Sequence, residues 1–131
     1  MARAITPFLM FDGVAQEAMD FYVGLFKGSA IRNVVLYGPG EPGREGSIKV
    51  ADFVLGDQRF RCIDSPVKHP FGFTPSLSIF VDCDDEAELD ETFKQLSAGG
   101  KILMPLGNYG FSKKFGWLND RFGVSWQLNL P

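Results

Sequence analysis

Residues 8–28, FLMFDGVAQEAMDFYVGLFKG, decide the fold, because a second version of them occurs 72 positions later as residues 80–100, FVDCDDEAELDETFKQLSAGG. The identities at this shift, which continue beyond the quoted stretch, are Phe8/Phe80, Asp12/Asp84, Ala15/Ala87, Phe21/Phe93, Gly28/Gly100, Tyr37/Tyr109 and Gly38/Gly110. Self-similarity at a fixed spacing indicates a duplicated structural unit. We therefore expect one domain, residues 1–131, built from two copies of about residues 4–65 and 75–131.

The first copy predicts one helix among four strands. Apolar and β-branched runs bounded by turn residues predict strands at residues 5–11, 30–37, 47–55 and 59–64. Apolar residues at three- and four-residue spacing predict a helix with one buried face; they are Ala15, Ala18, Met19, Tyr22, Leu25 and Phe26. Asp12 is predicted to cap this helix and Gly28 to end it. The loop GPGEPGREG (residues 38–46) and a turn at Gly56-Asp57 complete the copy.

The second copy repeats this order. Strands are predicted at residues 76–82, 101–106, 113–118 and 124–129, with a helix over 85–97 and a turn at NDRFG, residues 119–123. The helix presents Leu89, Phe93 and Leu96 on one face, with Asp84 as its expected cap and Gly99-Gly100 at its end. The fold class is therefore α+β: duplicated βαβββ units that form a half-open mixed β-sheet cleft with helices on the outside.

Composition excludes several classes of protein. The chain has 131 residues, 45% hydrophobic and 22% charged, with a net charge of −3, which is ordinary for a globular protein. It has no basic stripe for nucleic acid and no apolar run of about 20 residues for a membrane span. No signal peptide is evident, and Cys62 and Cys83 do not form a C-x-x-C pair. We expect a cytoplasmic protein that binds neither nucleic acid nor membrane.

The last predicted strand alternates between two kinds of side chain. Val124, Trp126 and Leu128 share one face, while Ser125, Gln127 and Asn129 share the other. The apolar set is expected to pack against the helix, and the polar set to line the cleft.

Three stretches resemble a known superfamily: FDGVAQEAMDFYVGLF (residues 11–26), SLSIFVDCDDEAELDETFKQLSAGG (76–100) and FGWLNDRFGVSWQLNLP (115–131). Together they make the chain similar, over nearly its whole length, to the vicinal oxygen chelate superfamily, which includes glyoxalases, extradiol dioxygenases and bleomycin-resistance proteins. The helix pattern of Ala18, Phe21 and Tyr22 is typical of the superfamily at large. The run from Gly116 to Gln127 resembles the PhnB-like subfamily, whose members are often labelled 3-demethylubiquinone-9 3-methyltransferase. The resemblance implies a glyoxalase-like fold.

The resemblance also implies where a metal would bind. Superfamily enzymes place His, Glu or Gln ligands on the first and last strands of each unit. The first strands here offer residues 4–7, which include no usual ligand, and the neighbourhood of Ser76; the last strands offer Cys62 or Asp64, and Gln127. Such a set supplies at most two protein donors, so we expect no metal and no other cofactor. A divalent metal held weakly by Asp64 and Gln127 is the alternative.

Other candidate residues have structural readings beside their functional ones. Cys62 can be a nucleophile activated by neighbouring arginines or a small core residue, and Asp64 can be a general base or a turn cap. His69, the one histidine, suits a surface loop better than a base. The acidic residues at 82–91 suit capping and solubility better than calcium binding.

Three functions follow as hypotheses. The first is a metal-free small-molecule-binding protein whose cleft is lined by Ser76, Ser78, Trp117, Ser125, Gln127 and Cys62. The second is an enzyme, of lyase, isomerase or dioxygenase type or with the labelled methyltransferase activity, in which Asp64 or Cys62 are the candidate catalytic residues. A methyl donor usually sits at a glycine-rich strand-to-helix turn, whereas residues 38–46 lie between two strands. The third is an interaction domain that forms a homodimer.

Overall fold

A computed structural model describes residues 2–131 of the chain. The chain divides into two compact units, of which unit 1 ends at Pro70 and unit 2 spans Phe71–Pro131. Each unit contains one predicted copy of the repeat, and each is described by itself below. The predicted cleft, which would need both units, stays a prediction.

Unit 1 has the predicted order of elements. They are β1 (Phe8–Phe11), α1 (Ala15–Leu25), β2 (Ala30–Leu36), β3 (Ile48–Leu55) and β4 (Gln58–Asp64). Gly28 follows the helix with a φ of +73° and Gly56 forms the β3–β4 turn with a φ of +59°, a region that favours glycine. The predicted β3–β4 turn is therefore confirmed, whereas α1 already ends at Leu25 with Phe26 as its C-cap, and Gly28 lies in the turn that follows.

Unit 2 repeats the order with β5 (Ser78–Asp82), α2 (Glu86–Ser97), β6 (Lys101–Gly107), β7 (Lys114–Asn119) and β8 (Ser125–Leu130). Every predicted element is present, although the first strands of the two units start two or three residues later than expected. Proline cannot donate a ladder hydrogen bond, and Pro7, inside the first predicted strand, directly precedes β1.

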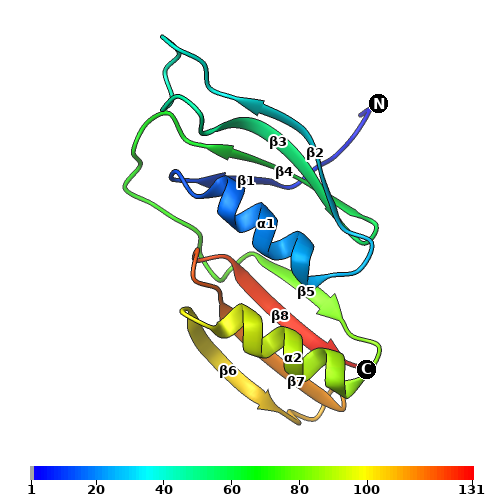
Figure 1. Ribbon diagram of the computed structural model, residues 1–131. Helices are drawn as coiled ribbons and strands as arrows, with labels where there is room; N and C mark the ends of the chain where they lie inside the picture. Colours follow the sequence, from blue (N-terminus) through cyan, green and yellow to red (C-terminus); the bar gives the residue numbers. More distant parts are fainter. Residues whose placement is uncertain (1) are drawn as a thin grey trace. The chain divides into compact units, whose positions relative to one another are not determined.

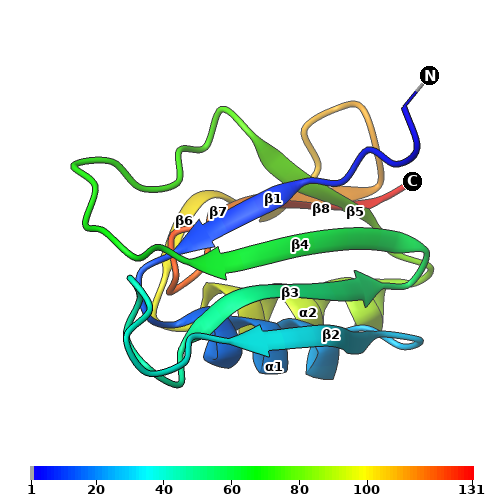
Figure 2. The same ribbon diagram turned by 90° about the horizontal axis from the view of Figure 1, so that it is seen from above.

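Each unit is a four-stranded mixed sheet with one helix. The strand orders are β1-β4-β3-β2 and β5-β8-β7-β6, in which only the β1–β4 and β5–β8 pairs are parallel (Figure 1; Figure 2 shows the four strands of unit 1 side by side). This confirms the α+β class with duplicated βαβββ units. We call the side of each sheet that its own helix does not cover the helix-free face.

The helices bury the faces that their periodicity predicted. Ala15, Ala18, Met19 and Tyr22 of α1 are fully buried, and the Tyr22 ring lies 6.2 Å from that of Phe53 on β3. In α2, Leu89 and Leu96 are fully buried. A Cβ at Gly116 of β7 would lie only 2.4 Å from the Phe93 ring, so glycine lets α2 approach the sheet closely. These contacts fix which side of each strand faces its helix.

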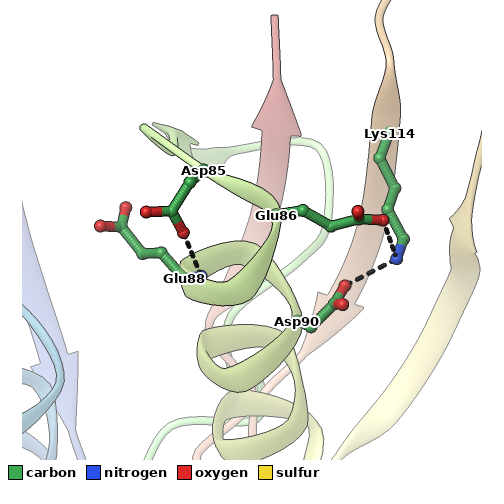
Figure 3. Close-up of polar contacts among 5 residues, drawn as sticks. All are labelled: Asp85, Glu86, Glu88, Asp90 and Lys114. Carbon is green, nitrogen blue, oxygen red and sulfur yellow. Dashed lines mark hydrogen bonds and ion pairs between the residues drawn. The ribbon is translucent and has the colours of Figure 1, made fainter.

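Both predicted helix caps are wrong. The N-cap of α1 is Val14, which makes no side-chain cap, and the amide of Ala15 instead donates to the Asp64 carboxylate at 3.0 Å. The N-cap of α2 is Asp85, one residue after the predicted Asp84, and it accepts from the Glu88 amide at 2.8 Å (Figure 3). In unit 1, Asp64, which is distant in sequence, therefore caps the first amide of α1 in place of Asp12.

The acidic start of α2 has a structural role. Lys114 of β7 donates to Glu86 at 3.0 Å and to Asp90 at 2.7 Å, so it ties the helix to the sheet (Figure 3). Among residues 2–131, no group of three His, Cys, Asp or Glu side chains is placed to hold a metal ion. In the same range, no helix is long and apolar enough to span a membrane.

Candidate functional site

Four of the predicted cleft residues meet on the helix-free face of unit 2. Ser78 lies on β5, Trp117 on β7, and Ser125 and Gln127 on β8. The Ser125 hydroxyl lies 2.7 Å from the Ser78 hydroxyl and accepts from the Trp117 indole at 2.8 Å, and the Gln127 amide donates to Ser78 at 3.2 Å. We call these four residues the polar cluster. It holds the amide of Gln127 and the indole of Trp117 in fixed orientations.

The face assignment of β8 is confirmed by its packing. Leu128 pairs with Gly116, whose missing side chain would point at α2, so Leu128 and Trp126 lie on the helix side. Both are fully buried, and the Trp126 indole donates to Asp120 at 2.9 Å. Gln127 lies between them in sequence and therefore on the helix-free face, as predicted.

An aromatic cluster adjoins the polar cluster. Phe80 of β5 pairs directly with Gln127, and its ring lies 6.3 Å from that of Phe115 on β7. Tyr109 and Phe111, from the β6–β7 loop, contact the Phe115 ring with centroids 6.1 and 5.0 Å away. Phe80, Tyr109 and Phe111 remain 54, 42 and 63% exposed. Exposed aromatic side chains gathered in one place mark a surface suited to an apolar ligand or partner.

Two amide groups on this face have unused hydrogen-bonding capacity. Asn129 donates to Asp82 at 2.9 Å, while its own buried Oδ1 accepts no hydrogen bond from residues 2–131. Gln127 uses its nitrogen on Ser78, and within the described chain nothing donates to its Oε1. The Asn129 Oδ1 is shielded from the surface, so the Gln127 Oε1 is the acceptor on this face that a ligand carrying N–H or O–H groups would use.

The corresponding row in unit 1 is charged. From β1 to β2, the residues paired across the sheet are Phe8, Arg61, Asp52 and Arg32. The equivalent residues of unit 2, from β5 to β6, are Phe80, Gln127, Trp117 and Met104. Arg61 is therefore the counterpart of Gln127. Its Nε donates to Asp52 at 2.8 Å, and this hydrogen bond is the main reason that the pKa of Asp52 is lowered and that of Arg61 raised.

Cys62 and Asp64 do not belong with these residues, which corrects the prediction for β4. Asp64 accepts from the amides of Ala15 at 3.0 Å and Ile48 at 2.9 Å, so it faces α1, and Cys62 two residues earlier shares that side. Cys62 is fully buried, and burial raises the pKa of its thiol to about 12. The predictions that Cys62 lines the cleft and that Asp64 is a metal donor together with Gln127 are wrong, because both β4 side chains lie on the helix side of their sheet. The raised pKa also disfavours a thiolate at Cys62.

The remaining candidates lie outside the polar cluster. Ser76 is exposed before β5 and hydrogen-bonds the Thr74 hydroxyl at 2.7 Å, and His69 lies in the segment between β4 and β5. Asp120 is confirmed as a turn residue, since its carboxylate accepts from the Phe122 and Val124 amides. The sequence analysis did not include Phe80 or Arg61 among the site residues. The 72-residue shift, which matches Phe80 with Phe8, and the alternation along β4, which separates Arg61 from Cys62, could have identified them.

Comparison with known proteins gives the family. Residues 3–129 match the family described as 3-demethylubiquinone-9 3-methyltransferase. The chain belongs to this PhnB-like family. A structure of the PhnB protein from Bacillus cereus is 54% identical, with a TM-score of 0.95 over 98% of this chain and 100% of that one. Protein PA1353 from Pseudomonas aeruginosa is 30% identical, with a TM-score of 0.85 over 98% of each chain.

More distant structures share the fold alone. The fosfomycin resistance protein FosX from Listeria monocytogenes, solved with Mn(II) and 1S,2S-dihydroxypropylphosphonic acid, has a TM-score of 0.68 at 11% identity over 100% of this PhnB-like chain and 94% of that one. The fold is thus that of the vicinal oxygen chelate superfamily, as the resemblance implied. No curated protein matches the PhnB-like chain significantly.

Proposed function

We propose that this PhnB-like protein binds a small molecule on the helix-free face of unit 2. The observation that carries the proposal is that the polar cluster, with its fixed Gln127 amide, adjoins three half-exposed aromatic rings. Small-molecule sites combine apolar and aromatic lining with a few oriented polar groups. The ligand class is an apolar or aromatic molecule that carries a hydrogen-bond donor, because the Gln127 nitrogen is used on Ser78 and its Oε1 is left as an acceptor.

We propose that this binding needs no metal. The polar cluster offers one amide, two hydroxyls and an indole N–H, and the indole cannot coordinate a cation. Divalent ions in proteins prefer carboxylate, imidazole or thiolate donors. This donor set does not fit such an ion, and no step of the proposed function uses one.

The experiment is native mass spectrometry of the protein from its source, followed by a thermal-shift panel of aromatic amides and phenols. We expect a retained or stabilising ligand whose effect is lost in Gln127→Ala and Phe80→Ala. The matched control is Gln95→Ala, because Gln95 lies on the exposed side of α2, where its side chain donates to Glu91. No retained molecule and no stabilising compound, or equal loss in the control, would contradict the proposal.

The second candidate function is enzymatic, because the family description names a methyltransferase. The glycine-rich loop at residues 38–46 joins β2 to β3 and precedes no helix, so a methyl donor lacks the usual helix N-terminus there. Calorimetry with S-adenosylmethionine and a transfer assay with a demethylated quinone test this activity directly. Elemental analysis with a lyase, isomerase and dioxygenase substrate screen tests the metal-dependent alternatives. Stoichiometric metal, lost in Gln127→Ala, would reverse our ranking.

We also propose that the protein works in the cytoplasm. Cys62 and Cys83 are both free and buried, which suits a reducing compartment. Fractionation of the source cells, with immunodetection of the native protein, tests the location, and recovery outside the cytoplasm would contradict it.

A further inference from the structure

We propose that the helix-free face of unit 1 is a binding site for an oxyanion, a carboxylate or a phosphate, with Arg61 as its principal contact. The observations that carry this site all come from unit 1. Its residues lie in one row across three strands, with Arg61 on β4, Asp52 on β3 and Arg32 on β2.

Arg61 is held in place while its anion-binding atoms stay unused. Its Nε donates to the Asp52 carboxylate at 2.8 Å, and its side chain is still 46% exposed. No residue among 2–131 accepts a hydrogen bond from its two terminal nitrogens. A guanidinium fixed through Nε can present those nitrogens as a fork, which matches the paired oxygens of a carboxylate or phosphate.

Asp52 is committed to holding Arg61 and does not cancel the positive charge of the face. Its two oxygens accept from Arg61 and, at 3.4 Å, from the Asn33 amide, and it is nine-tenths buried. Strand alternation places Arg59 on the same face, and its charge also helps to lower the pKa of Asp52. This face therefore presents Arg32, Arg59 and Arg61 around Asp52, an excess of positive charge that attracts anions.

The register also places an apolar side chain beside the guanidinium. Phe8 of β1 pairs with Arg61 and is 58% exposed. An oxyanion attached to an apolar or aromatic body would contact both residues, whereas a free phosphate would use only the arginines. Both kinds of ligand would be recognised through the paired oxygens of an oxyanion. Benzoate represents the oxyanion on an aromatic body, and inorganic phosphate represents the free ion.

The experiment follows amide chemical shifts of the full chain during titration with inorganic phosphate, with benzoate, and with benzamide as the neutral match for benzoate. We expect phosphate or benzoate, but not benzamide, to shift the amides of residues 59–61, with an affinity that falls as salt rises. Arg61→Gln should weaken binding at least about tenfold, and Arg61→Lys should weaken it less, because lysine keeps the charge but lacks the fork.

Two controls separate this site from charge in general and from loss of folding. Arg44→Gln removes an exposed arginine of the β2–β3 loop and should leave anion binding unchanged. The double variant Asp52→Asn with Arg61→Gln removes the pair together, leaves no buried carboxylate without its partner, and should also lose binding. Gln127→Ala should bind the anion normally, so a failure of the function proposed for unit 2 would leave this result intact.

The proposal is overturned if neither anion binds at millimolar concentration, or if benzamide binds as well as benzoate. It is equally overturned if Arg44→Gln and Arg61→Gln weaken binding alike. A preference for benzoate would assign an apolar carboxylate as the ligand class, and a preference for phosphate would assign a phosphate; both outcomes support an oxyanion site.

Discussion

At the scale of single residues, Asp64 shows how one buried carboxylate connects distant parts of unit 1. It accepts from the first amide of α1 and from the first amide of β3, and its own carbonyl accepts from the Tyr37 hydroxyl at 2.9 Å. A residue proposed as a base or a turn cap is thus a structural anchor, since both of its oxygens are already engaged.

Replacing Asp64 should therefore reduce stability. In Asp64→Asn the amide nitrogen would face a backbone N–H, which leaves a buried donor unsatisfied at a cost of about 1–3 kcal/mol. Urea unfolding measures this loss. Asp12→Asn, at the cap predicted from sequence, should change stability by less than about 0.5 kcal/mol. Equal losses in the two variants would contradict the assignment.

The pair of Asp52 and Arg61 predicts a pH dependence of stability. The hydrogen bond from Arg61 lowers the pKa of Asp52 from its ordinary 3.8, so the folded state holds the ionised form more strongly than the unfolded state does. The stabilisation is fully present above pH 3.8 and is lost as the pH falls through the lower, folded-state pKa. Unfolding of wild type and Asp52→Asn from neutral to acid pH should show a difference that shrinks only below pH 3.8. A constant difference would refute this linkage.

Both cysteines should be inert in the folded protein. Burial is the largest cause that raises the pKa of Cys62 and of Cys83 to about 12, so few thiolates exist near neutral pH. We expect alkylation by iodoacetamide only at the rate of unfolding, and rapid labelling of both in denaturant. Prompt labelling of Cys62 in native protein would restore it as a candidate nucleophile.

At the scale of elements, the two helices start by different means. The α2 start is local, because the Asp85 carboxylate accepts from the Glu88 amide three residues later. The α1 start depends on Asp64, which is 49 residues away in sequence. Local patterns can identify the first kind of cap to within a residue, whereas the second kind leaves no local pattern.

This difference makes a prediction for α2. Asp85→Ala should cost about 1 kcal/mol, the usual value for an aspartate N-cap, while Asp84→Ala should cost little because Asp84 makes no cap. Chemical denaturation of the two variants provides the measurement. A larger loss at Asp84 would mean that the sequence-based cap, rather than the one in the structure, is correct.

At the scale of the whole molecule, the apolar edge of unit 1 bears on assembly. Strand β2 is an edge strand, and its consecutive residues Val34, Val35 and Leu36 are all exposed. Long exposed apolar edges favour pairing with another chain. We expect a homodimer, measured by size-exclusion chromatography with light scattering, and expect Val35→Lys to shift it toward monomer. A monomeric wild-type protein would contradict the expectation.

The sequence by itself determined the duplicated βαβββ order and the position of every helix and strand within a few residues. It also placed Ser78, Trp117, Ser125 and Gln127 in the predicted cleft lining, together with Ser76 and Cys62, which the structure places outside the polar cluster. These are consequences of periodicity and repetition, which are local properties. On β8 the alternation of apolar and polar residues is regular, so the helix-free face could be read directly.

Only the tertiary structure decided the faces of β4. A strand read one residue out of register presents its opposite side, and the resemblance to metal-binding relatives implied that Cys62 or Asp64 lined the cleft. Long-range hydrogen bonds to Ala15 and Ile48 satisfy that carboxylate on the helix side. Arg61 therefore lies on the helix-free face as the counterpart of Gln127. Which charged residue of β4 is buried depends on partners that folding brings together from distant parts of the chain.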